Sequence, residues 1–124
     1  MDVEELFLQP GDRVDQLRVD RVLGQGAFAV TYLVTDTVLN APFALKEFLP
    51  RERAHRAPDG SLQPIDSSAE EAFRQGREAF VAEGRVLAGL DHPNVVKVLR
   101  CFEARNTAYL QMPFYRGEAL HRLL

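Results

Sequence analysis

The sequence predicts an α+β fold, an antiparallel sheet of five strands with one long helix packed on it. Runs dense in β-branched and aromatic residues follow one another closely and are separated by short turn segments. One later segment instead carries an apolar stripe at helical spacing. The chain has 124 residues, of which 46% are hydrophobic and 27% charged, enough for one domain or one lobe of a larger protein.

The strands are expected on both sides of the helical segment. Turn signals separate them: 24–27 is glycine-rich, Asn40 and Pro42 mark a second connection, and 105–106 a third. Residues 1–13 are expected to be a lead-in and 14–112 the folded unit, with 50–66 as a loop because it carries three prolines and a glycine. The expected strands cover residues 16–24, 28–35, 43–49, 95–103 and 108–112.

The helix is expected over residues 68–90. Two capping boxes fit its start, Ser67 with Glu70 or Ser68 with Glu71. Glu83 lies inside the apolar stripe, where a carboxylate is costly unless it reaches water at the stripe's edge or pairs with a cation. The stripe consists of Ala72, Phe73, Gly76, Ala79, Phe80, Glu83, Val86, Leu87 and Leu90.

Charge and composition exclude several classes of function. A net charge of −3 argues against broad binding to nucleic acid or to an anionic membrane, and no stretch approaches a membrane span. The single cysteine, Cys101, is expected in the core of a cytoplasmic protein, since it has no disulfide partner within the chain. His55 and His92 lie in turn segments without metal-ligand spacing, so we expect no metal site.

The segment from Leu23 to Lys46 carries the candidate chemistry. Gly24-x-Gly26-x-x-Ala29 satisfies the dinucleotide-binding pattern, but that motif must open a helix and be followed by an acidic residue. Here a strand follows, and Lys46 occupies the neighbourhood of the acidic residue. A hairpin turn whose amides approach an anion, or a purely structural hairpin, therefore remains. Lys46 lies in an apolar strand and shares a face with Ala44 and Phe48.

Five segments in order strengthen the phosphate-binding interpretation: LGQGAFAVTYLV, FALKEFLP, FVAEGRVL, DHPNVVKV and TAYLQMPFYRGEAL. Together they resemble the small lobe of the protein kinases, in particular of bacterial Ser/Thr kinases, over residues 10–124. The resemblance implies the kinase N-lobe fold, with the long helix as the family's αC helix. It further implies that the lobe binds ATP and that, in the complete enzyme, the γ-phosphoryl group passes to a protein hydroxyl.

The resemblance also implies site residues. Lys46 would contact the α- and β-phosphates and Glu83 would be its partner on the helix, which accounts for both unusual charges. Ala29 replaces the third glycine of the motif, a departure that stiffens the loop. Met112 would be the gatekeeper, and the Pro113 carbonyl and the Tyr115 amide would meet the adenine. The implied ATP-binding set is Leu23, Gly24, Gln25, Gly26, Ala27, Phe28, Ala29, Thr31, Ala44, Lys46, Met112, Pro113 and Tyr115.

The 124 residues contain no H-R-D and no D-F-G segment, which in this family supply the base and the magnesium ligands. We therefore expect Mg²⁺ only in the complete kinase, a missing C-lobe after a truncated hinge at 113–124, and no activity from this chain alone. Three hypotheses follow: the N-terminal piece of a kinase with a protein substrate, whose reading frame continues past codon 124; a stand-alone, pseudokinase-like nucleotide-binding module that docks on a partner protein; and an interaction domain that binds no nucleotide.

Overall fold

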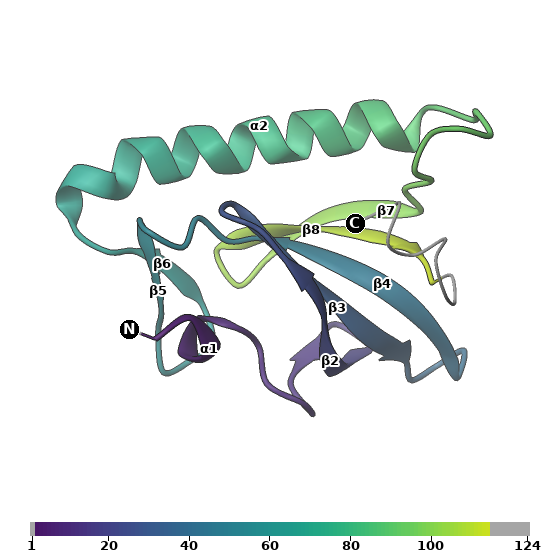
Figure 1. Ribbon diagram of the computed structural model, residues 1–124, viewed down its shortest axis with the longest axis horizontal. Helices are drawn as coiled ribbons and strands as arrows, with labels where there is room; N and C mark the ends of the chain where they lie inside the picture. Colours follow the sequence, from purple (N-terminus) through teal and green to yellow (C-terminus); the bar gives the residue numbers. More distant parts are fainter. Residues whose placement is uncertain (1, 115–124) are drawn as a thin grey trace.

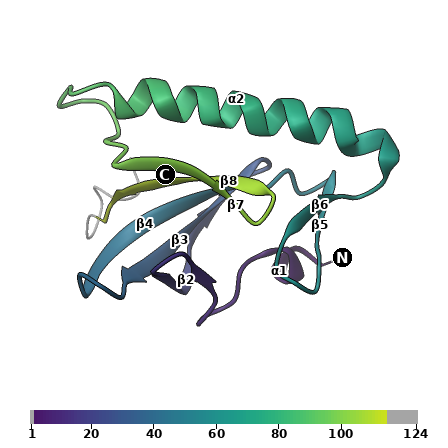
Figure 2. The ribbon, with the colours of Figure 1, turned by 180° about the vertical axis from the view of Figure 1, so that it is seen from behind.

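The computed structural model describes residues 2–114, in which one long helix crosses a six-stranded antiparallel sheet (Figures 1 and 2). The sheet has the order β1-β2-β3-β4-β8-β7, and a separate two-stranded hairpin is formed by β5 and β6. The strands are β1 (Arg13–Val14), β2 (Leu17–Gln25), β3 (Ala29–Asp36), β4 (Ala41–Phe48), β5 (Ala54–Arg56), β6 (Leu62–Pro64), β7 (Arg100–Ala104) and β8 (Thr107–Pro113). The helices are α1 (Val3–Leu6), the 3-10 turn η1 (Ser67–Ala69) and α2 (Glu70–Ala88).

The sheet differs from the expected one at its two edges. A sixth strand arises because Arg13 and Val14 pair with Arg18 and Leu17 across a tight turn in which Asp15 has φ +52°. The expected strand at 95–103 was wrong in its first half, because β7 begins only at Arg100. Val98 is buried without joining the ladder, so the β-branched run before β7 supplies core side chains rather than strand pairing.

The interpretation of 50–66 as a plain loop was also wrong. Residues 54–56 and 62–64 pair as an antiparallel hairpin, with Ala54 opposite Pro64 and Arg56 opposite Leu62. Its prolines lie at permitted places, Pro58 in the connection and Pro64 at the end of β6. Figures 1 and 2 both show this hairpin beside α1, away from the open part of the main sheet.

The 3-10 turn η1 that leads into α2 is capped by Asp66 rather than by either expected serine, and α2 itself has no side-chain cap. Asp66 precedes η1, and its Oδ1 accepts a hydrogen bond from the Ala69 amide at 3.1 Å and from the Ser68 hydroxyl at 2.5 Å. Neither expected capping box forms, because η1 occupies residues 67–69 and the α-helix proper begins at Glu70. An aspartate at this position satisfies an otherwise unpaired amide as well as a serine would.

Two glycines allow α2 to lie close to the sheet. A Cβ at Gly76 would come within 2.7 Å of Phe48 Cζ, and one at Gly84 would overlap Leu110 Cδ2 and lie 2.9 Å from Cys101 Sγ. Arg77 fixes the helix laterally, since its Nη1 donates to the Asn106 carbonyl and side-chain oxygens, each at 2.9 Å. The outer end of the expected stripe is not covered: Val86 is 64% exposed and Leu90 47%.

The core consists of two apolar clusters. One includes Tyr32, Leu45, Leu49 and Tyr109, together with Leu6, Phe7 and Leu8, so the predicted lead-in contributes three buried side chains. The other joins Ala44, Val98, Leu110 and Met112 to side chains of α2. The two ends of the sheet are also connected, because Arg100 on β7 pairs with Asp15 at 3.4 Å and Arg105 donates to the Arg13 carbonyl at 2.6 Å.

Candidate functional site

Strand register decides which side chains surround Lys46. Lys46 on β4 lies opposite Thr31 on β3 and opposite Leu110 on β8. Directly opposed residues of an antiparallel pair share a face, and successive residues of one strand alternate between faces. Lys46 therefore lies on the α2 side of the sheet with Ala44 and Phe48, and its neighbours Leu45 and Glu47 lie on the other side.

A cleft of about 410 Å³ opens beside Lys46, and we call it the Lys46 cleft. Lys46 supplies the only cation among its described lining residues. Its walls come from the end of β2, the turn after it and the start of β3, with Lys46 at one side. The lining residues are Leu23, Gly24, Gln25, Gly26, Phe28, Ala29, Thr31 and Lys46. All eight belong to the set named from the sequence.

The glycine turn, residues 24–29, is closed by a hydrogen bond from the Gly26 amide to the Ala29 carbonyl at 2.8 Å. Nothing in the fold demands a glycine at position 26: its φ is not positive, and the nearest atom to an added Cβ is 3.8 Å away. Because Gly26 has no side chain, it leaves the backbone of the cleft wall accessible. A wall of this kind lets a ligand approach the backbone closely.

The other described residues of the predicted ATP-binding set do not line the Lys46 cleft, and only some of them lie next to it. Ala44 and Met112 are buried and share one apolar cluster with Leu23, next to the cleft. Pro113 ends β8 opposite Phe43 and is half-buried. Ala27 lines a different cavity. Tyr115 lies outside the described residues.

Glu83 and Lys46 are not brought together. The Glu83 side chain is exposed, and within residues 2–114 no ion pair joins its carboxylate to Lys46. The residue after it, Gly84, is the one that faces β7 and β8 at close range.

Glu47, which the sequence analysis did not single out, is the most completely partnered carboxylate of the described residues. Its side chain is fully buried, and the Tyr32 hydroxyl donates to Oε1 at 2.7 Å and the Tyr109 hydroxyl to Oε2 at 2.6 Å. Arg56 adds a two-pronged ion pair, with Nη2 2.7 Å from Oε1 and Nη1 3.2 Å from Oε2. We call these four residues the Glu47 network.

Three side chains of the Glu47 network have raised pKa values. Burial raises the pKa of the Tyr32 and Tyr109 hydroxyls, and the adjacent negative charge of Glu47 raises it further. Burial alone would lower the pKa of the Arg56 guanidinium, but Glu47 outweighs it and the net direction is upward. The two tyrosines therefore stay protonated as hydrogen-bond donors, and the Arg56 guanidinium keeps its charge.

The network also ties the N-terminal segment to β4. Arg56 Nε donates to the Leu6 carbonyl at 2.9 Å, and the Leu8 amide donates to the Tyr32 hydroxyl oxygen at 3.0 Å. Beyond β4, the Leu49 amide donates to Phe28 O at 2.8 Å and the Arg51 amide to Ala27 O at 3.2 Å, so the same strand end holds the glycine turn. The only signal in the sequence was a glutamate at an inward position of an apolar strand.

Residues 2–114 contain neither a cluster of metal-ligating side chains nor a membrane-spanning helix. No group of three or more histidine, cysteine, aspartate and glutamate side chains is arranged to hold a metal ion there. Nor is any helix in this range long and apolar enough to cross a membrane.

The glycine turn and Lys46 both lie in a segment that matches a known protein family. The family model described as "Protein kinase domain" matches residues 17–124. The chain belongs to the protein kinase family. Among curated kinases, it is similar to the Ser/Thr protein kinase YPK3 of Saccharomyces cerevisiae, at 28% identity over 108 residues, and to the probable Ser/Thr protein kinase YbdM of Bacillus subtilis, at 26% over 109.

These matches cover 81% and 88% of this chain but only 21% and 36% of the two relatives. Among solved structures, the kinase entitled "PpkA-294 apo form" superposes with a TM-score of 0.85 at 32% sequence identity, over 90% of this chain and 40% of that one. The fold is therefore that of a kinase N-terminal lobe, as the sequence motifs predicted, and the chain spans less than half the length of each of these kinases.

Proposed function

We propose that this chain is the ATP-binding lobe of a Ser/Thr protein kinase, with the nucleotide held between the glycine turn and β4. One observation carries the proposal: the Lys46 cleft is lined entirely by the glycine turn, its flanking strands and Lys46. The family match supports it, because kinases use a glycine-rich loop and a strand lysine to hold ATP phosphates.

Each part of the cleft has a proposed role. The amides of the glycine turn, with Gly26 leaving room, face the phosphates, and Lys46 supplies a point charge to the α- and β-phosphates. Leu23, Ala44 and Met112 form the apolar surface for the adenine ring, beside the Pro113 carbonyl and the Tyr115 amide. In the complete enzyme, phosphoryl transfer to a protein hydroxyl needs Mg²⁺ and a catalytic base, from segments with H-R-D and D-F-G motifs that these 124 residues do not contain.

Glu83 remains the proposed partner of Lys46. Because the two side chains form no ion pair in this structure, the proposal requires α2 to approach the cleft when nucleotide is bound. The two halves of α2 are held differently: Arg77 fixes the first half to the β7–β8 turn by hydrogen bonds, whereas the second half packs through Gly84 and leaves Val86 exposed. Movement of the far end leaves the Arg77 contacts in place.

A second candidate is a nucleotide-binding, pseudokinase-like module that docks on a partner protein. The separation of Lys46 and Glu83 favours it, because such a module needs the cleft but not the pair that supports phosphoryl transfer. Both candidates require nucleotide binding. They differ in whether a kinase large lobe follows in the same reading frame, which the DNA downstream of codon 124 decides.

The chain contains only two lysines, Lys46 and Lys97, and this permits a sharp test. A nucleotide acyl phosphate, which acylates a lysine amine close to bound phosphates, should label Lys46, and excess Mg-ATP should suppress that labelling. Lys97 is exposed in the 91–99 segment and should show only background labelling unaffected by ATP. Equal labelling of both lysines, or no protection by ATP, would overturn the proposal.

Thermal unfolding provides the equilibrium measurement. ATP or ADP at about 100 times its dissociation constant stabilises a binding-competent fold by about 2.7 kcal/mol. We expect Lys46→Ala to abolish most of this increase in the melting temperature and Lys97→Ala to preserve it. A folded wild-type chain with no response to either nucleotide would contradict both candidate functions.

A further inference from the structure

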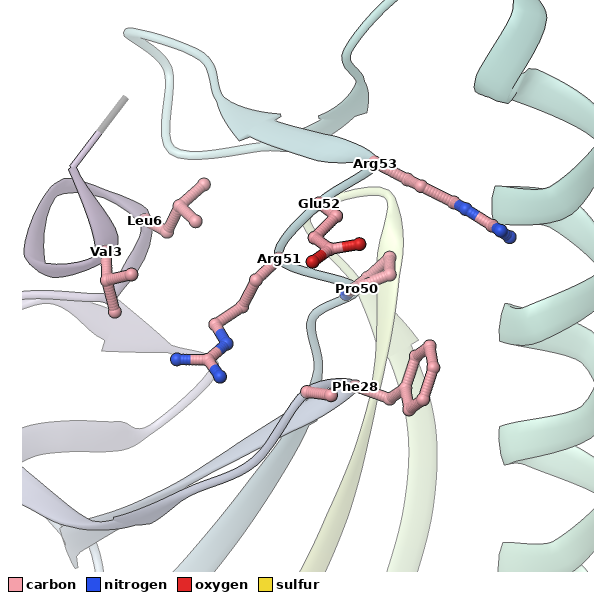
Figure 3. A pocket seen from close by; sticks show the side chains of 8 residues that line it. Val3, Leu6, Phe28, Pro50, Arg51, Glu52 and Arg53 are labelled. Atoms are coloured by element: carbon pink, nitrogen blue, oxygen red, sulfur yellow. The ribbon is translucent and has the colours of Figure 1, made fainter.

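A second cavity adjoins the glycine turn. It has a volume of about 430 Å³, and we call it the Arg51 pocket. Figure 3 shows three segments around it: α1 with Val3 and Leu6, the glycine turn with Phe28, and the 50–53 turn after β4. A cavity of this size suits a small organic molecule or a few amino-acid residues.

The apolar wall of the Arg51 pocket is made by Val3, Leu6, Phe28 and Pro50. Phe28 is 66% exposed, which is unusual for a phenylalanine of a folded domain. It lines both the Arg51 pocket and the Lys46 cleft. A ligand with an apolar body would bury part of this ring.

The charged wall is made by Arg51, Glu52 and Arg53. Within residues 2–114 none of these three belongs to an ion pair, so Arg51 and Glu52 do not neutralise each other. Arg51 has one weak side-chain contact, from Nη1 to Gln25 Oε1 at 3.3 Å. In Figure 3, Arg51 extends toward the α1 side of the pocket, whereas Arg53 extends away toward α2.

We propose that the Arg51 pocket binds a small zwitterionic ligand with an apolar body, such as a hydrophobic amino acid. The anionic group pairs with Arg51, the ammonium group pairs with Glu52, and the apolar part contacts Phe28 and Leu6. A ligand of this chemistry satisfies both unpaired charges at once, whereas an apolar molecule satisfies neither and an ion of one sign satisfies only one.

Such a ligand would act on the glycine turn. The Arg51 amide donates to the Ala27 carbonyl, and the Arg51 side chain contacts Gln25, so both ends of this residue hold the turn. Ligand bound to the Arg51 guanidinium and to Phe28 therefore changes the position of a wall that the Lys46 cleft shares. This coupling, unlike binding itself, rests on the proposed nucleotide function.

Three matched probes test the site on the 124-residue chain without nucleotide. L-Phenylalanine carries both charges, 3-phenylpropionate lacks the ammonium group and phenethylamine lacks the carboxylate. Amide shifts in NMR spectra should place L-phenylalanine at residues 27–28 and 50–53 with a dissociation constant on the order of 1 mM. Each missing charge should weaken binding by about two- to fivefold, the range for partly exposed ion pairs.

Variants assign the two charges. Arg51→Gln should bring L-phenylalanine down to the affinity of phenethylamine, and Glu52→Gln to that of 3-phenylpropionate. Arg85→Gln is the control and should leave all three affinities unchanged, because Arg85 is on α2 and does not line the pocket. Equal affinity for the three probes, shifts elsewhere on the protein, indifference to both variants or no binding at about ten times the expected constant would each overturn the proposal.

A final measurement concerns coupling. Saturating L-phenylalanine should change the ATP dissociation constant by about fivefold or more, the usual range of coupling between sites, and Arg51→Gln should remove the change. If the probes bind but ATP does not, the proposed function fails while the Arg51 pocket stands. If both bind without affecting each other, the coupling through the glycine turn is overturned.

Discussion

Lys46 and Glu47 are neighbours on β4, yet their surroundings are opposite. Lys46 faces a cleft beside the glycine turn and forms no ion pair with any residue from 2 to 114. Glu47 is fully buried and accepts hydrogen bonds from Tyr32, Tyr109 and Arg56. The buried side of β4 therefore fixes the backbone, and the open side carries the charge that the proposed function assigns to the nucleotide.

This arrangement pre-organises the cleft. A charge that already had a protein partner would have to break that contact before it could bind a phosphate, and binding would be weaker by that cost. The position of Lys46 is set instead by the Glu47 network and by the ladder to β3 and β8. Substitutions on the two sides of β4 should therefore differ in their effect on stability.

The largest effect is expected from Glu47→Ala. It removes the carboxylate that forms the buried ion pair with Arg56, and breaking a buried pair in this way costs about 3–5 kcal/mol. Urea unfolding followed by circular dichroism measures the change. Glu47→Gln keeps the size and part of the hydrogen bonding, so its loss should be smaller. A loss under about 1 kcal/mol for Glu47→Ala would show that the network does not hold the sheet together.

The next largest effect needs no substitution. Because the folded-state pKa values of Tyr32 and Tyr109 are raised, their stabilising contribution is complete below about pH 10, the ordinary value for tyrosine. It is lost as the pH rises above 10 toward the folded-state values, by about 1.4 kcal/mol per tyrosine and pH unit.

The measurement is tyrosinate absorbance in an alkaline titration. Of the chain's three tyrosines, Tyr32 and Tyr109 should ionise only together with unfolding, in one cooperative step. Smooth ionisation of all three near pH 10, with the circular dichroism signal unchanged, is the result that contradicts burial of the network.

Gly84→Ala tests how closely α2 must lie over the open side of β4. The added methyl group would overlap Leu110 Cδ2 and lie 2.9 Å from Cys101 Sγ, so we expect a loss of about 1–3 kcal/mol from overpacking. Gly89→Ala is the control, since its Cβ would meet nothing nearer than a backbone oxygen at 3.6 Å. Equal stability of the two variants in urea would mean that the helix can lift at no cost.

The smallest stability change is expected from Lys46→Ala. Lys46 is half-buried at a cleft and has no ion pair to lose, so the free energy of unfolding should change by about 0.5 kcal/mol or less. The same variant should lose nucleotide binding. A stability loss comparable to that of Glu47→Ala would remove the contrast between the two faces of β4.

Local signals in the sequence predicted much of the candidate cleft. The glycine pair, the strand after it and Lys46 on the next strand predicted a set of binding residues. Eight residues of that set line one cavity in the structure. They could do so because β2, the glycine turn, β3 and β4 are consecutive, and short connections bring consecutive antiparallel strands together. The helix stripe likewise placed Phe73 in the core.

The remaining features depend on contacts between distant parts of the chain. Glu47 meets Tyr32, Arg56 and Tyr109 from separations of 15, 9 and 62 residues, and no local pattern marks these four as partners. The side-chain amide of Asn106 donates to the Leu62 carbonyl and so holds the β5–β6 hairpin. The sequence did not predict this hairpin, because the prolines in 50–66 indicated a loop. Residues 95–99 have strand-forming composition but form a loop, because tertiary packing outweighs β-strand propensity there.

The sequence by itself determined the family, the fold class, the glycine turn and Lys46 as the candidate phosphate-binding charge, because these reside in residue types at short, fixed spacings. The tertiary structure alone decided three further points about residues 2–114: Lys46 has no ion pair there while Glu47 is buried and fully hydrogen-bonded. Glu83 is exposed and does not line the cleft, and Arg51 and Glu52 line one pocket without forming an ion pair in this range. Pairing of charges depends on distances of a few ångströms between segments far apart in the chain, and only packing sets those distances.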